Sequence, residues 1–190
     1  MNETQLSGIL EGIWGLLEES VEDRRNGFRT PALATLTPES GCSVRTVVLR
    51  AVDRRKRCVR FYTDLRSPKA KQIQADPRTA LMFQDPARQV QLRAEAEARL
   101  HQAGILAARC WDTLPVGSRR DYAAAVPPGS PTPEAPPHEE TTPDGGRRNF
   151  AVADCTIARL DWLELDSDGH RRAVFTWTEK GELSASWVVP

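Results

Sequence analysis

Cationic side chains surround the predicted start of a short helix in the stretch "LRSPKAKQI". Ser67 is a typical N-cap residue and Pro68 occupies the favoured first helical position, so a helix is predicted over 68–75. The free N–H groups at such a helix start attract anions, and phosphates commonly bind there. Arg66 and Lys69 suit a phosphate that lies between them and these N–H groups. The alternative is that both cations point into solvent.

A second pair of cations brackets the apolar stretch "RTVVLR" at residues 45–50. Because side chains alternate along a strand, their odd separation sends Arg45 and Arg50 to opposite faces of the predicted strand. A cation on each face of so apolar a strand could serve a bound ligand. The alternative is that each arginine extends from a strand end toward water.

No plausible nucleophile–base pair or metal-binding motif accompanies these cations in the sequence. The histidines and cysteines are scattered without ligand spacing: His101, His138, His170, Cys42, Cys58, Cys110 and Cys155. A metal site and a disulfide framework are therefore not expected. Anion-binding groups without an obvious catalytic acid or base are typical of a protein whose chemistry resides in a bound cofactor.

The charge balance favours a small anionic ligand over a nucleic acid. The 190 residues contain 26 basic and 26 acidic side chains, whereas nucleic-acid binders usually carry a basic excess or a basic face. No apolar run approaches the roughly 20 residues that a membrane span needs. The acidic, amphipathic N-terminus lacks the features of a signal peptide. Together with the scattered cysteines, these features predict a cytoplasmic protein that binds neither nucleic acid nor membrane.

The elements that must position the cations follow from hydrophobic periodicity and turn residues. Helices are predicted over 4–19, 102–115 and 118–126, in addition to 68–75. Strands are predicted over 30–37, 42–52, 58–64, 78–84, 88–100, 149–165, 171–179 and 182–189. The first three strands are expected to form an antiparallel meander. The proline-rich segment 127–148 is predicted to be a loop without regular structure, either functional or disordered.

These elements predict a mainly β fold with peripheral helices. The sequence shows about eight strands and no alternation of strands with helices of the βαβ kind. The strand over 88–100 alternates apolar and polar residues, so one face belongs to the core and the other to solvent or ligand. An antiparallel barrel formed by one domain over residues 1–190 fits best.

Five stretches in a fixed order carry a resemblance to a known family. They are "RTVVLR", "FYTDLRSPKAKQI", "ADPRTALMF", "RQVQLRAEAE" and the C-terminal "DWLEL…HRRAVF…VVP". The chain resembles the pyridoxamine 5′-phosphate oxidase family of FMN-binding split β-barrels, and its broadly distributed branch more than the biosynthetic oxidase itself. The resemblance implies FMN as cofactor, a split barrel, and a homodimer with FMN at the subunit interface.

The resemblance also implies which residues contact the cofactor. These are Arg45, Thr46, Val47, Val48, Arg50, Tyr62, Thr63, Arg66, Ser67, Lys69, Gln89 and Trp162. Arg45 and Lys69 are implied phosphate ligands, the strand backbone approaches the isoalloxazine, and Arg50 lies near the flavin or the substrate. Pro68 replaces an arginine of the family, and Arg66 could substitute for it.

The substrate positions depart from the family pattern. Trp111, Arg119 and Arg172 are the candidates for substrate contacts, and Val174 stands where the family has a flavin-contacting arginine. The resemblance implies an FMN-dependent oxidoreductase with a small-molecule substrate. Two alternatives stay open: an FMN-dependent reductase of a substrate outside vitamin B6 chemistry, and a non-enzymatic module that binds flavin, another nucleotide, haem or another protein.

Overall fold

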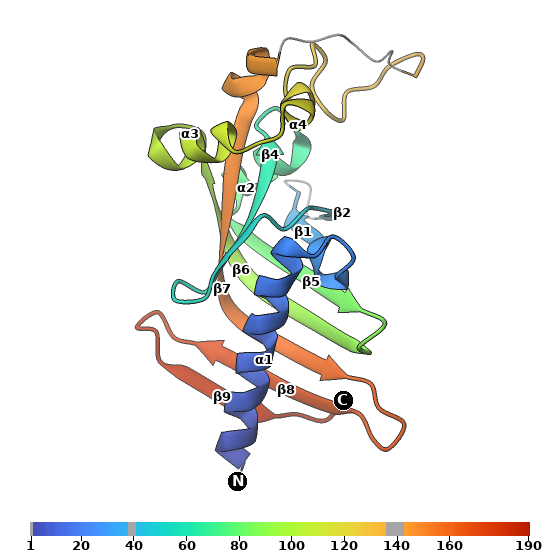
Figure 1. The fold of residues 1–190 in the computed structure, drawn as a ribbon, viewed down its shortest axis with the longest axis vertical. Coiled ribbons are helices and arrows are strands. Elements are labelled where there is room, and N and C mark those ends of the chain that lie inside the picture. The colour runs from blue at the N-terminus through green and yellow to red at the C-terminus, as the bar shows by residue number, and fades with distance from the viewer. Residues whose placement is uncertain (1, 38–40, 136–142) are drawn as a thin grey trace.

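The computed structural model describes residues 2–37, 41–135 and 143–190, and Figure 1 labels its elements. The helices are α1 (Asn2–Glu22), α2 (Pro68–Ala75), α3 (Gly104–Asp112) and α4 (Val116–Arg120), with the 3₁₀ helices η1 (Gly27–Arg29) and η2 (Pro143–Asn149). The strands are β1 (Ala32–Leu36), β2 (Cys42–Thr46), β3 (Ala51–Asp53), β4 (Cys58–Asp64), β5 (Arg78–Asp85), β6 (Val90–His101), β7 (Phe150–Glu164), β8 (Arg171–Trp177) and β9 (Leu183–Trp187).

These strands form one antiparallel sheet in the order β2-β1-β5-β6-β7-β4-β3, with β8 paired to β7 and β9 paired to β8. The 15-residue strand β7 runs the length of the sheet (Figure 1). Its first half pairs with β4 and its second half pairs with β8, while β6 follows it on the other side. The antiparallel β fold with peripheral helices is therefore confirmed.

The predicted meander of the first three strands is wrong. The expected strand 42–52 is two strands, and β2 and β3 lie at opposite ends of the sheet order although only residues 47–50 separate them. In this link, the N–H groups of Val47 and Leu49 donate to carbonyls that precede β1, whereas the N–H group of Arg50 donates to Arg60 of β4. The link thus crosses from one edge of the sheet to the other. The sheet must curl for this to happen, but it does not close by pairing β2 with β3.

The broken strand also removes the argument that Arg45 and Arg50 face opposite ways. Alternation of side chains holds only within one continuous strand. Arg45 lies in β2, and Arg50 lies just before β3.

The hydrophobic core lies between α1 and the sheet. Leu6, Ile13, Trp14 and Leu17 bury one face of α1, at the spacing of an amphipathic helix. The alternation predicted for 88–100 is confirmed, and these residues of β6 are buried: Val90, Leu92, Ala94, Ala96 and Ala98. Across the described ranges, no helix is long and apolar enough to cross a bilayer.

Helix α2 is confirmed over the predicted residues, whereas the helix predicted over 118–126 is correct only for its first three residues. α4 ends at Arg120. The Tyr122 ring packs on a neighbouring aromatic cluster, and the carbonyls of Tyr122 and Ala124 accept hydrogen bonds from Arg66 instead of from a next helical turn. The expectation that 127–148 has no regular structure is correct for 127–135 but wrong from Pro143, where η2 begins. Residues 136–142 of that loop lie outside the described residues.

Candidate functional site

Buried hydroxyl groups organise the start of α2. Ser67 has extended backbone angles, its Oγ accepts a hydrogen bond from the Ala70 N–H (3.4 Å), and it donates to the Asp64 carbonyl (2.6 Å). The Thr63 Oγ1 lies 3.2 Å from the Ser67 Oγ. Both side chains are buried. The predicted contacts Thr63 and Ser67 therefore shape the helix start, and their hydroxyl groups already have partners inside the protein.

Arg45 of β2 and Lys69 of α2 form a pair of neighbouring cations. Burial lowers the pKa of Arg45. Burial also lowers the pKa of Lys69, and repulsion from the Arg45 charge lowers it further, with a smaller opposing effect from Asp64. Among the residues that the structure describes, neither cation has a carboxylate within ion-pair distance. Two partly buried cations without a carboxylate fit a phosphate group, which would restore the interactions that burial removes.

Arg66, the predicted substitute for the missing arginine of the family, is already engaged. Its guanidinium pairs with Asp64 (2.7 Å) and donates to the carbonyls of Ala124 (2.8 Å) and Tyr122 (3.4 Å). Nearby, a Cβ added to Gly129 would lie 3.0 Å from Pro68 Cγ. The segment after α4 thus lies against the start of α2. A contact between Arg66 and a phosphate would require this ion pair to open.

Arg50 lies over an aromatic cluster. Its Cζ is 5.5 Å from the centre of the Tyr62 ring, and this ring contacts Phe150 edge to face at 5.1 Å. Burial raises the pKa of Tyr62, with a further contribution from a hydrogen bond to Cys110. Burial also raises the pKa of Tyr122 to about 12. Both phenols are therefore neutral near pH 7, and the cluster presents apolar ring faces beside one cation.

Thr46 and the first two residues of the link 47–50 differ in exposure. Thr46 and Val48 are exposed, whereas Val47 is buried in the core. A ligand could therefore reach the side chains of Thr46 and Val48 but only the backbone of Val47.

The candidate substrate residues do not form one site. Trp111 is 1% exposed and belongs to a second hydrophobic core with Phe150. Arg119 donates to the carbonyls of Leu114 (3.1 Å) and Asp112 (2.9 Å) and stacks over Trp111. The Trp111 ring packs inside the protein and also lines a pocket of about 610 Å³, so a contact between Trp111 and a substrate stays a prediction.

Gln89, Trp162 and Arg172 lie at the far end of the sheet. Gln89 precedes β6 in a left-handed turn conformation (φ 55°), so its placement inside a strand is wrong. Trp162 pairs across from Leu92 and is buried, and Arg172 forms a two-bond ion pair with Asp161 at 2.9 Å.

This far end is too distant to share one ligand with Tyr62 in the same chain. Tyr62 pairs with Val152, which lies ten residues before Trp162 on β7. At roughly 3.3 Å per strand residue, the two positions are about 30 Å apart. Figure 1 shows α3 and α4 at one end of β7 and β8 at the other.

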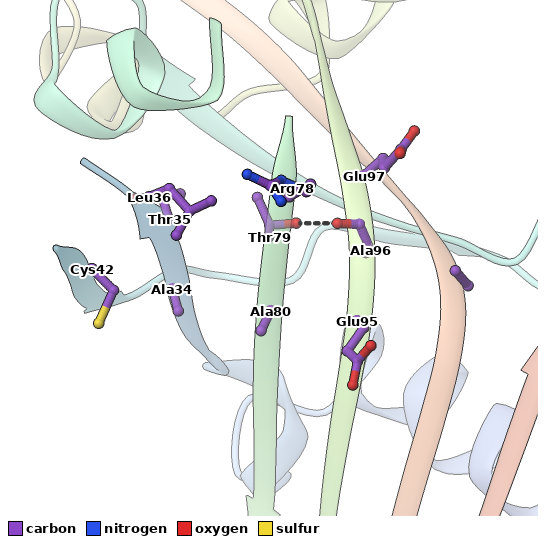
Figure 2. Close-up of a pocket in the computed structure, with 11 residues that line it drawn as sticks. Ala34, Thr35, Leu36, Cys42, Arg78, Thr79, Ala80, Glu95, Ala96 and Glu97 are labelled. Carbon is purple, nitrogen blue, oxygen red and sulfur yellow. Dashed lines mark hydrogen bonds between the residues drawn. The ribbon is translucent and has the colours of Figure 1, made fainter. Parts of the chain in front are cut away.

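A separate pocket of about 420 Å³ opens on the outer face of the sheet (Figure 2). Its lining includes small side chains from three strands, Ala34, Ala80 and Ala158, together with Arg78, Glu95 and Glu97. The predicted cofactor residues do not line it. The cation pair Arg45–Lys69 is therefore the better candidate for a cofactor site.

Two residues of the cation site were missed by sequence reasoning. Thr35 and Gln72 both hydrogen-bond to the Arg45 guanidinium. Gln72 follows Lys69 by three residues, so helical spacing could have placed both on one face of α2. No local signal marks Thr35, because its role depends on the pairing of β1 with β2.

Comparisons with known proteins found one matching domain family and several similar proteins. Residues 13–102 match the family described as "Pyridoxamine 5'-phosphate oxidase, FMN-binding domain". A pyridoxine/pyridoxamine 5'-phosphate oxidase of Erythrobacter litoralis is 36% identical over 83 residues, which cover 44% of this chain and 38% of that protein. The corresponding protein of Anaeromyxobacter dehalogenans is 35% identical over 111 residues, covering 50% and 54%. The chain thus matches only about two fifths to half of the length of these relatives.

Solved structures share the fold over most of the chain. A pyridoxamine 5'-phosphate oxidase-related, FMN-binding protein of Nostoc punctiforme has a TM-score of 0.76 and 25% identity, covering 93% of this chain and 96% of that one. PhzG of Burkholderia lata, solved with tetrahydrophenazine-1-carboxylic acid, has a TM-score of 0.70 over 86% and 83% of the two chains, and at 16% identity it supports the fold alone.

The fold is that of the FMN-binding split-barrel proteins, and the part of the chain that carries the cation pair matches an FMN-binding domain. Residues 13–102 are thus similar to the FMN-binding domain of pyridoxamine 5′-phosphate oxidases, and most of the chain shares the fold of a related FMN-binding protein.

Proposed function

We propose that this protein is an FMN-dependent oxidoreductase that holds the FMN phosphate between Arg45 and Lys69. The observation that carries the proposal is this pair of partly buried cations, which lacks a carboxylate partner among the described residues. Bound FMN supplies a hydride acceptor. The role of the chain is to bind and orient the cofactor and to set the charge around it.

Arg50 is the proposed charged group at the ring end of the cofactor. It lies over Tyr62 at the edge of the aromatic cluster, where a cation would stabilise negative charge that develops on a neighbouring ring. The neutral phenols of Tyr62 and Tyr122 add ring surface without adding charge. Arg50 thus acts by electrostatics and not by proton transfer.

A homodimer is part of the proposal. Gln89 and Trp162 are implied FMN contacts, yet they lie about 30 Å along the sheet from Tyr62. A twofold symmetric dimer would bring these residues of one subunit to the cofactor site of the other. Each dimer would then hold two equivalent sites.

The substrate is proposed to lie outside vitamin B6 phosphates, although the curated relatives are oxidases of pyridoxine and pyridoxamine 5′-phosphate. Among the candidate substrate residues, Trp111 is in the core, Arg119 donates to backbone carbonyls and Arg172 is paired with Asp161. The engaged arginines favour a substrate that brings no second phosphate. Oxidation of a B6 phosphate remains the second candidate because of the named relatives.

An absorption spectrum tests the binding of FMN, and a turnover assay tests the oxidoreductase activity. Purified protein titrated with FMN should gain a flavin spectrum that shifts on binding, and nicotinamide or other small donors should bleach it. Protein that binds no FMN would refute the proposal at its base. FMN that binds but that no donor reduces would instead favour a non-enzymatic module, and release of hydrogen peroxide with pyridoxamine 5′-phosphate would favour the B6 oxidase.

A further inference from the structure

Arg45 is held by two neutral side chains from two different elements. Its guanidinium donates to the Thr35 hydroxyl of β1 and, at 2.9 Å, to the Gln72 side-chain carbonyl of α2. The Thr35 hydroxyl in turn donates to the same Gln72 oxygen at 2.6 Å. Thr35 is 1% exposed, and the three side chains form a closed ring of hydrogen bonds.

This arrangement differs from that of two other partly buried arginines, Arg60 and Arg172. Arg60 pairs with Asp154 and Arg172 pairs with Asp161, so a carboxylate compensates each of these charges. Around Arg45, the acceptors are a hydroxyl and an amide. Neutral acceptors fix the orientation of a guanidinium but do not compensate its positive charge.

Arg45 is partly buried without a carboxylate partner among the described residues, and this burial lowers its pKa. Lys69 stands close enough to be repelled by the Arg45 charge. A sequence that evolved for stability alone would gain from a glutamate in place of Gln72, because the two side chains have nearly the same shape and a carboxylate would pair with Arg45. An amide at this position makes sense if the charge is needed by an anionic ligand.

We propose that Thr35 and Gln72 are positioning residues that aim the Arg45 guanidinium at the phosphate subsite beside Lys69, and that the neutrality of Gln72 is required for phosphate affinity. The inference rests on the proposed FMN site and adds to it the two residues that set its phosphate selectivity.

The test compares FMN with riboflavin, which has the same ring system but no phosphate. Dissociation constants are measured by flavin fluorescence for the wild type, Gln72→Glu and the matched control Gln74→Glu, which adds the same charge at an exposed position of the same helix. Gln72→Glu should weaken FMN binding at least tenfold and change riboflavin binding by less than twofold. Gln74→Glu should change neither ligand by more than twofold.

Thr35 supplies an independent pair of variants. Thr35→Val removes the hydroxyl at nearly constant shape and should weaken FMN binding severalfold, whereas Thr35→Ser keeps the hydroxyl and should retain it. Thermal unfolding of each variant checks that the fold is intact. If Gln72→Glu does not fold, Thr35→Val and Thr35→Ser still test whether Arg45 is positioned by its neutral partners.

The outcomes separate this inference from the function on which it rests. Wild-type protein that binds FMN no better than riboflavin would overturn the phosphate site itself. A wild-type preference for FMN that persists in Gln72→Glu, or an equal loss of both ligands, would overturn the positioning role of Gln72 and Thr35 and leave the FMN site in place.

Discussion

Replacement of Lys69 by methionine should change stability and cofactor affinity in opposite directions. In the protein without FMN, Lys69 is partly buried and repelled by Arg45, and both effects lower its pKa. A lysine with a lowered folded pKa destabilises the fold while it is charged, and this penalty is relieved as pH rises through the folded pKa. Lys69→Met removes the penalty at neutral pH. The melting temperature of the FMN-free variant should therefore exceed that of the wild type.

The loss of FMN affinity follows from the same charge. A hydrogen bond to a charged group contributes about 1.5–3 kcal/mol. Because 1.4 kcal/mol corresponds to a factor of ten, the dissociation constant should rise by about tenfold to a hundredfold. Riboflavin, which lacks the phosphate, should bind both proteins equally well.

The assay is thermal unfolding with and without FMN, at neutral pH, together with a fluorescence titration. A ligand at 100 times its dissociation constant stabilises the folded state by about 2.7 kcal/mol. Added FMN should therefore reverse the order of melting temperatures, so that the wild type becomes the more stable protein.

Lys71→Met is the matched control, since Lys71 is exposed and lies on the same helix. It should alter neither the melting temperature of the FMN-free protein nor the FMN affinity. A Lys69→Met protein that is less stable without FMN, or that binds FMN as the wild type does, would refute the reasoning that this lysine is kept for an anion.

Three further predictions concern other parts of the molecule. Gly129→Val should release the segment that lies against α2, because Gly129 has a φ of 86° and its Cβ would lie 3.0 Å from Pro68 Cγ; limited proteolysis should cut the variant faster, and an unchanged cleavage rate would count against this contact. Trp111→Ala should lower the free energy of unfolding by about 3–5 kcal/mol, because the ring is in the core. A denaturant titration measures this, and unchanged stability would contradict a structural role of the ring and favour a contact with substrate. Asp161→Asn should remove an acid-sensitive part of the stability, since Arg172 is the main cause of the lowered pKa of Asp161. The charged Asp161 stabilises the fold above its unfolded pKa of about 3.9, and this contribution is lost as pH falls through the lower folded pKa. Melting temperatures between pH 7 and pH 3 should fall less in the variant, and parallel profiles would contradict the role of the ion pair.

Local signals were reliable where a helix or strand is specified by its own residues. Ser67 and Pro68 predicted α2 to the residue, because the N-cap hydrogen bond and the fixed proline angle act within one turn. The alternation in β6 predicted its buried face, since the side-chain period of a strand is a property of the backbone. The break after Thr46 had no such signal. The residues 47–50 are as apolar as a strand, but their N–H groups find partners in two separate parts of the chain.

The resemblance names the candidate phosphate ligands, but it does not give the state of their charges. Arg66 and Arg45 look equivalent in the sequence, since each lies beside a predicted anion site. In the fold, Asp64 compensates Arg66, whereas Arg45 meets only neutral acceptors from β1 and α2 among the described residues. The partner of Arg66, Asp64, is 2 residues away in the sequence, whereas the partner of Arg45, Gln72, is 27 residues away. These partners decide which guanidinium has a charge that no carboxylate compensates.

The sequence by itself determined the secondary structure of most segments, the apolar faces that form the core, and the candidate cations for a phosphate. Only the tertiary structure decided that β2 and β3 lie at opposite ends of the sheet, that Trp111 is buried, and that Gln89 and Trp162 lie far from the other candidate contacts. The reason is physical. Periodicity and capping act over a few neighbouring residues, whereas strand pairing and the compensation of buried charge depend on groups that only the folded chain brings together.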